Sequence, residues 1–108
     1  MAVIDHLCNI AEHQHVHYIA KRQSDVRTIL NRIEATGRAS EIRYANGAEE
    51  ARFPGGGQIT FGCEGNPRSR GRTYQHVVLE DHRPLSNQRF LEEVEPGFTE
   101  PARYTIIG

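Results

Sequence analysis

The sequence has little cysteine and no long apolar run. Its two cysteines, Cys8 and Cys63, lie far apart, and neither belongs to a CxxC pair. This spacing gives no support to a disulfide framework or a zinc ribbon, so reduced thiols in the cytoplasm are the default expectation. No apolar run reaches the roughly 18 residues that a membrane-spanning helix needs. The N-terminal region also carries acids where a secretory signal would be basic. We therefore expect a cytoplasmic protein that neither spans a membrane nor is exported.

The net charge is close to zero, and lysine is scarce. The formal net charge is -1, so no positive field over the whole domain would draw the protein to nucleic acid or to an anionic membrane. Any binding of that kind must come from a local patch. The basic residues are 12 arginines and a single lysine, Lys21. Two explanations of this skew stay open: the coding composition of the gene, and selection for guanidinium groups that pair bidentately with phosphate.

The composition that remains is that of a folded domain. The chain has 108 residues, of which 37% are hydrophobic and 25% charged. These proportions are ordinary for globular proteins and differ from the low-hydrophobicity composition of disordered chains. A chain of this length can bury roughly two thirds of its unfolded surface, which is enough for one modest core. We expect a single domain over residues 1–108.

A helix and a strand are predicted at the start of the chain. Apolar residues at helical spacing predict an amphipathic helix over residues 3–13. Residues 15–20, HVHYIA, alternate with the period of a strand. This alternation puts Val16, Tyr18 and Ala20 on one face of the strand.

The most regular helical pattern follows over residues 25–36. Ser24 is the expected N-cap, and Gly37 supplies the left-handed stop. The apolar residues of this helix recur at i, i+3, i+4 and i+7, as Val26, Ile29, Leu30 and Ile33.

The rest of the chain is predicted to be mainly strands. Two linked hairpins over residues 41–63 turn at Asn46-Gly47 and at the PGGG segment 54–57. After a loop comes HVVL, a continuous apolar run typical of a central strand, then a helix capped by Ser86 and a last apolar strand. Buried strands that alternate with helices predict a three-layer α/β domain. Its sheet should be mostly parallel, with an antiparallel hairpin insertion.

Two acids, Glu80 and Asp81, directly follow the HVVL strand. We call them the acidic pair. In open parallel sheets, ligands bind outside the carboxyl ends of the strands. Carboxylates there can hold Mg²⁺ through oxygen and can orient or deprotonate an attacking water. The sequence therefore makes the acidic pair the candidate catalytic and metal-binding residues.

The motifs from residue 15 onward resemble those of a known family of motors. HYIAKRQSDVRTILNRI leads to YANGAEEARF with its Asn-Gly turn, then to GGGQITFGCEGNPRSRGRTYQHVVLEDHRPLSNQRFLEEV and to ARYTIIG. This order resembles the ATPase core of phage terminase large subunits, which package DNA into proheads. Arg70-Gly71 looks like the Arg-Gly element of that family, and Val77 to Asp81 looks like its Walker B strand. The resemblance implies a phage protein of the host cytoplasm that acts with DNA, a nucleotide or a packaging motor.

The sequence departs from that family in two places. A Walker A motif needs glycines whose amides cradle phosphates, followed by lysine and a hydroxyl residue. Here Lys21 has no glycine before it, and the three glycines at 55–57 precede Gln58. The acids also stand as Glu80 then Asp81, the reverse of the family order, and a misplacement of about 1 Å can cost on the order of 100-fold in rate. We therefore expect no independent hydrolysis, and Mg²⁺ with ATP only if another molecule completes the site.

A second candidate site is the basic loop, formed by Arg68, Arg70, Gly71 and Arg72. Guanidinium groups pair bidentately with phosphate, and glycine permits close approach of the backbone, so the loop is a candidate phosphate or nucleic-acid contact. The alternative is a solvated loop whose arginines pair with the acidic pair or with the acidic run at 92–95.

Two other classes of function stay open. The histidines His13, His15 and His17 suggest a metal-binding regulator, although no second ligand pair of recognisable spacing follows them. The hairpins at 41–63 suggest instead a protein-interaction or inhibitor module, which would offer an exposed strand edge to a partner and have no nucleotide or DNA site.

Overall fold

The structure is a computed structural model that describes residues 2–107. It contains three α-helices, two 3-10 turns and six strands within this range. In chain order they are α1 (Ala2–Ala11), β1 (His15–Ala20), α2 (Gln23–Ala35), β2 (Glu41–Arg43), β3 (Glu50–Arg52), β4 (Gln58–Cys63), β5 (His76–Leu79), η1 (Arg83–Ser86), α3 (Gln88–Val94), η2 (Glu95–Gly97) and β6 (Tyr104–Ile106).

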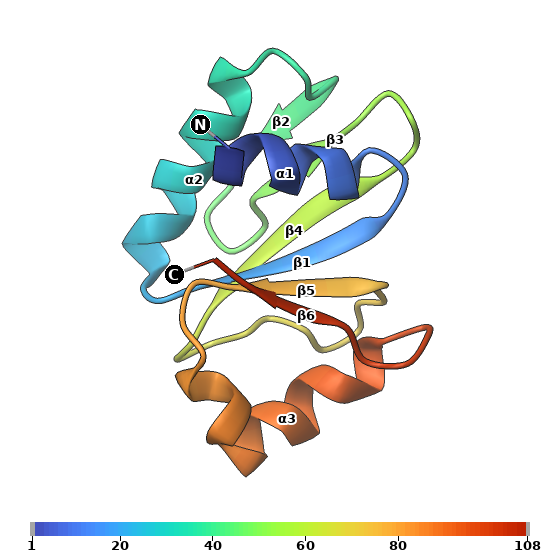
Figure 1. The fold of residues 1–108 in the computed structure, drawn as a ribbon. Helices are drawn as coiled ribbons and strands as arrows, with labels where there is room; N and C mark the ends of the chain where they lie inside the picture. Colours follow the sequence, from blue (N-terminus) through green and yellow to red (C-terminus); the bar gives the residue numbers. More distant parts are fainter. Residues whose placement is uncertain (1, 108) are drawn as a thin grey trace.

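The strands form one mixed sheet in the order β2-β3-β4-β1-β5-β6 (Figure 1). Strands β4, β1, β5 and β6 run parallel, and β3 and β2 continue the sheet as an antiparallel hairpin beside β4. Tyr18 in the central strand β1 lies opposite Phe61 of β4 and Val78 of β5. This arrangement confirms the expected α/β fold, a mostly parallel sheet with an antiparallel hairpin insertion.

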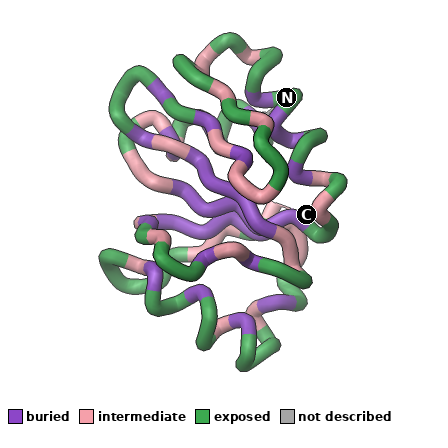
Figure 2. The backbone as a smooth tube through the Cα atoms, turned by 180° about the vertical axis from the view of Figure 1, so that it is seen from behind, coloured by how far each residue is buried: buried purple, intermediate pink, exposed green. Residues whose placement is uncertain are grey.

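Helices cover both faces of the sheet. Helices α1 and α2 pack on the face that carries Val16, Tyr18 and Ala20, whereas α3 packs on the opposite face against Val77 and Leu79. Buried residues are concentrated along the central strands, as Figure 2 shows from behind. The continuous apolar run of β5 is explained by this double cover, because a strand buried on both faces has no polar side.

Helix α2 has the predicted buried face and a different start. Its buried residues are the four that helical spacing singles out, and Gly37 has the left-handed φ of 73° expected of the stop. The helix begins at Gln23, however, with Arg22 rather than Ser24 as N-cap. Arg22 has the extended backbone of a cap residue but makes no capping hydrogen bond with its side chain. The amides of the first turn are therefore not satisfied by a side-chain cap.

Helix α3 also starts later than expected. Residues 83–86 form the 3-10 turn η1, so Ser86 lies inside that turn. The side chain of Asn87 caps α3 instead, because its Oδ1 accepts from the backbone amides of Arg89 at 3.0 Å and Phe90 at 3.4 Å. Between residues 2 and 107, no helix combines the length and the apolar composition that crossing a bilayer requires.

Candidate functional site

The strand order creates a switch point at the carboxyl ends of β1 and β5. The chain leaves β1 toward β4 on one side, and it later enters β5 on the other side of β1. Helix α2, which follows β1, covers one face, and α3, which follows β5, covers the other. Where connections diverge in this way, a crevice opens outside the strand ends, and α/β proteins use it for ligands.

A cleft of about 520 Å³ lies at this point. We call it the switch-point cleft. Its walls come from the start of α1, one side of α2 and the strand ends. Its lining residues are Val3, Ile4, Tyr18, Lys21, Arg22, Asp25, Thr28, Ile29, Arg32, Glu80 and Ile107. The volume falls within the range of roughly 300–1,000 Å³ that is usual for small-molecule sites.

The connection from β1 to α2 consists of Lys21 and Arg22 alone. It has the strand-loop-helix arrangement of a P-loop and lies where a P-loop would hold phosphate. A P-loop motif, however, has eight residues with glycines that let its amides wrap the phosphate chain. Two residues without glycine cannot form that cradle, so only the side chains and the first turn of α2 are available to an anion here.

Glu80 lies on the floor of the cleft with both carboxylate oxygens engaged. The hydroxyl of Tyr18 donates to Oε2 at 2.6 Å, and the backbone amide of Lys21 donates to Oε1 at 2.9 Å. Tyr18 is fully buried, and burial raises the pKa of its phenol, with the hydrogen bond to Glu80 acting in the same direction. The phenol therefore stays protonated and remains a donor. Glu80 thus ties the end of β5 to β1.

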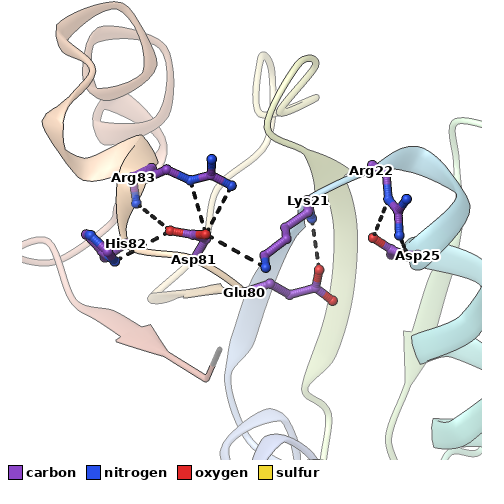
Figure 3. A network of polar contacts seen from close by, with 7 residues as sticks. All are labelled: Lys21, Arg22, Asp25, Glu80, Asp81, His82 and Arg83. Carbon is purple, nitrogen blue, oxygen red and sulfur yellow. Dashed lines mark hydrogen bonds and ion pairs between the residues drawn. The ribbon is translucent and has the colours of Figure 1, made fainter.

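Asp81 lies beside Glu80 among positive groups, as Figure 3 shows. Its Oδ2 is 3.1 Å from a terminal nitrogen of Arg83 and 3.8 Å from Lys21 Nζ, and its Oδ1 accepts from the backbone amide of Arg83 at 3.0 Å. That backbone hydrogen bond is the main cause that lowers the pKa of Asp81, and the charges of Arg83 and Lys21 add to it. Asp81 does not line the switch-point cleft.

The cationic side chains of the cleft differ in how they are paired. Arg22 pairs with Asp25 across one turn of α2, with Nε 3.3 Å from Oδ2. Lys21 Nζ pairs with Asp81, 3.8 Å from its Oδ2. Arg32 forms no ion pair with any carboxylate described between residues 2 and 107. It is therefore the guanidinium of the cleft that is free to meet a ligand.

The basic loop lies apart from the acidic pair. Arg70, Gly71 and Arg72 line a separate cavity of about 290 Å³ together with Glu92 and Glu93 of α3. This cavity shares no lining residue with the switch-point cleft.

Two arginines of the basic loop contact other parts of the protein's own backbone. Arg72 Nε donates to the carbonyl of Arg68 at 2.8 Å, and the guanidinium of Arg68 packs against Gly47. Arg70 is exposed, and Gly71 has a φ of 77° that suits glycine. Neighbouring carboxylates offset part of the positive charge, which weakens the attraction of this loop for phosphate.

The histidines of β1 form a hydrogen-bonded chain. His17 is fully buried; its Nε2 lies 2.6 Å from the carbonyl of Pro67 and its Nδ1 lies 2.7 Å from Thr60 Oγ1. A carbonyl only accepts, so Nε2 of His17 carries the proton and Nδ1 accepts from the Thr60 hydroxyl. Thr60 in turn accepts from His15 Nε2 at 3.0 Å. Because both nitrogens of His17 are engaged, this residue has no lone pair free for a metal.

The hairpin edge is short and charged. Strand β2 at the edge of the sheet has three residues, and Glu41 and Arg43 are exposed on it. Short charged edge strands discourage pairing with another chain. The interaction module predicted from the hairpins therefore gains no support from this edge.

Of the residues that line the switch-point cleft, the sequence singled out Glu80 as a candidate site residue but not the others. Lys21 and Arg22 directly follow a predicted strand, and that position alone could have marked them. Tyr18 and Arg32 had no such signal, because their roles depend on β5 lying beside β1 and on α1 lying beside α2.

Comparisons of the chain with protein-family models, with curated protein sequences and with solved structures gave no match in any of the three. The geometry of the switch-point cleft is therefore the main basis for a proposal about function.

Proposed function

We propose that this protein binds a nucleotide in the switch-point cleft and does not hydrolyse it. The observation that carries the proposal is the position of the cleft, at the carboxyl-end switch point of a mostly parallel sheet, with cationic groups and an apolar wall in the same space. A nucleotide combines the two chemistries that such a lining recognises, an anionic phosphate chain and a flat, weakly polar base.

The phosphate end of the ligand belongs beside the connection from β1 to α2. Lys21 and Arg22 supply two positive charges there, and the side chain of the N-cap residue Arg22 makes no capping hydrogen bond to the first turn of α2. Free amides at a helix N-terminus and the helix dipole both favour an anion. The pair of Arg22 with Asp25 is highly exposed on the arginine side, which is 78% accessible, so Arg22 can turn to phosphate at little cost.

The base belongs at the other end of the cleft. Arg22, the N-cap of α2, and Arg32 within the helix are ten residues apart, which corresponds to about 15 Å along a helix. Arg32 can therefore stack its guanidinium on a base while Arg22 meets phosphate. Val3, Ile4, Ile29 and Ile107 supply the apolar wall, and Val3 is 45% exposed, which is unusual for a large apolar residue in this chain.

Two features support binding without hydrolysis. The two-residue connection after β1 provides no glycine-rich cradle for the β and γ phosphates. Both oxygens of Glu80 already accept hydrogen bonds, from Tyr18 and from Lys21, so this carboxylate has a structural role in joining β5 to β1.

The proposal includes a relation to DNA-packaging motors. The support is the acidic pair at the end of the buried strand β5, in the position that the Walker B-like pattern of HVVLED implies. A protein of this kind would hold a nucleotide, or take part in a motor assembly, without performing the chemistry of the motor itself.

Isothermal titration with ATP and with adenosine tests the proposal. Arg22→Ala should weaken ATP binding about tenfold and leave adenosine unchanged, because it removes one charge-assisted contact worth roughly 1.5 kcal/mol. Arg32→Ala should weaken the binding of both ligands. Arg89→Ala, which removes an exposed arginine from α3, is the matched control. Absence of ATP binding in the parent, or equal affinities in all variants, would refute the proposal.

A further inference from the structure

We infer that the switch-point cleft takes its phosphate ligand as the metal-free anion, with Lys21, Arg22 and the first turn of α2 in place of a divalent cation. This inference rests on the proposed function. It assigns the acidic pair a different role from the Mg²⁺ ligation that the sequence pattern suggests: Glu80 and Asp81 hold the protein's own donors in place.

Two hydrogen bonds constrain Glu80 as a metal ligand in this setting. Mg²⁺ requires oxygen ligands in nearly ideal octahedral geometry and keeps several waters. Glu80 can offer such a shell only its remaining lone pairs, in the orientation set by the Tyr18 hydroxyl at 2.6 Å and the Lys21 amide at 2.9 Å. Tyr18 is fully buried, and a buried hydroxyl left without a partner costs about 1–3 kcal/mol. The existing bonds therefore oppose any metal position that requires the carboxylate of Glu80 to turn.

Asp81 is a poor ligand for an electrostatic reason. Its two oxygens face the Arg83 guanidinium, the Arg83 backbone amide and the Lys21 ammonium, and His82 Nδ1 lies 3.5 Å from Oδ1. A divalent cation here would replace those donors and would stand next to the positive charges of Lys21 and Arg83. Its attraction to one carboxylate is opposed by both of them.

The charges that line the cleft already suit an anion. Three cationic residues, Lys21, Arg22 and Arg32, and two acidic residues, Asp25 and Glu80, line it, which gives a formal balance of +1. Bound Mg²⁺ would cancel part of the phosphate charge and so weaken the attraction to Lys21 and Arg22. The protein should therefore bind free ATP at least as well as its magnesium complex.

The first experiment uses a metal alone. Mn²⁺ is titrated into the ¹⁵N-labelled protein, and the broadening of amide signals near Glu80 and Asp81 is compared with that near Glu92 and Glu93, an exposed acidic pair on α3. We expect residues 80 and 81 to broaden no more than residues 92 and 93. Selective broadening at 80 and 81 that disappears in Glu80→Gln or Asp81→Asn would overturn the inference, whether or not a nucleotide binds.

The second experiment compares ATP titrations in excess EDTA and in excess Mg²⁺. We expect the affinity in EDTA to equal or exceed that in Mg²⁺, and Glu80→Gln to leave the ratio of the two affinities unchanged. Binding that is tenfold or more tighter with Mg²⁺ would overturn the inference while leaving the proposed function intact. No ATP binding in either buffer would refute the proposed function, and the Mn²⁺ result would then decide whether the acidic pair binds metal.

Discussion

Lowering the pH from about 7.5 to about 5 should destabilise the protein through the buried imidazole of His17. Burial is the main cause that lowers the pKa of His17 from 6.5 to about 4, and the positive charge of Arg72 acts in the same direction. The hydrogen bond to the Pro67 carbonyl opposes this change only in part. In the unfolded chain, the same imidazole titrates at its ordinary value.

The sign and size of the effect follow from the two pKa values. Above pH 6.5, neither state of the protein holds the extra proton on His17. Between 6.5 and about 4 the unfolded chain binds it and the folded protein does not, so stability falls as the pH falls through this window. The whole gap corresponds to roughly 3 kcal/mol, of which about 2 kcal/mol should be lost by pH 5. His15, whose pKa is also lowered to about 4, should add a smaller loss because it is partly exposed.

Urea unfolding followed by circular dichroism measures this loss at a series of pH values. His17→Phe keeps an aromatic ring against Tyr74, whose ring stacks on His17 with centroids 5.1 Å apart, but removes the titrating group. The difference in unfolding free energy between parent and variant should therefore shrink by about 2 kcal/mol from pH 7.5 to pH 5. His82→Gln controls for the loss of one exposed imidazole.

Two results would refute this reasoning. One is a parent protein whose unfolding free energy changes by less than about 0.5 kcal/mol over the window, far below the expected loss. The other is a His17→Phe variant with the same pH dependence as the parent. If that variant does not fold, an NMR titration of the His17 ring protons in the parent gives the pKa directly, and a value near 6.5 would contradict the structure.

Two further predictions concern the loop between β4 and β5. Gly62→Ala should destabilise the protein by roughly 2–4 kcal/mol, because the new methyl group would overlap the Pro67 carbonyl that His17 binds. Gly65→Ala, with open space around it, is the control, and equal unfolding curves for the two variants would contradict the packing. Duplex DNA should bind weakly, and changing both Arg70 and Arg72 to Ala should reduce the slope of log K against log salt by up to about 2. If the slope of log K against log salt is the same in the double variant as in the parent, the DNA contacts lie on another surface.

Local patterns in the sequence were sufficient for most elements. The alternation of HVHYIA predicted β1 with its bounds, and the spacing of four apolar residues predicted the buried face of α2. Gly37 and the two hairpin turns were predictable because a left-handed or tight backbone selects particular residues. The starts of α2 and α3 were missed by one or two residues. At each helix, the backbone conformation of the preceding residues set the start. Arg22 is extended before α2, and the turn η1 precedes α3.

The candidate site was predicted only in part. The pattern HVVLED put Glu80 and Asp81 at a strand end, and the structure has them there. That Glu80 binds Tyr18, 62 residues earlier, depends on β5 pairing with β1. The sequence left two acidic partners open for the basic loop, the acidic pair and the acidic run at 92–95, and only the structure shows that Arg70 and Arg72 lie beside Glu92 and Glu93.

By itself, then, the sequence determined which segments are helices and strands, which faces they bury and where two acids leave a buried strand. These properties follow from periodicity and from backbone preferences that act over a few residues. Only the tertiary structure decided that β1 lies between β4 and β5, that α1 and α2 enclose a cleft, and that Arg32 lines it without an ion pair to the carboxylates of residues 2–107. Strand order and helix packing result from many weak contacts between distant residues acting together. No single motif in the sequence specifies these contacts.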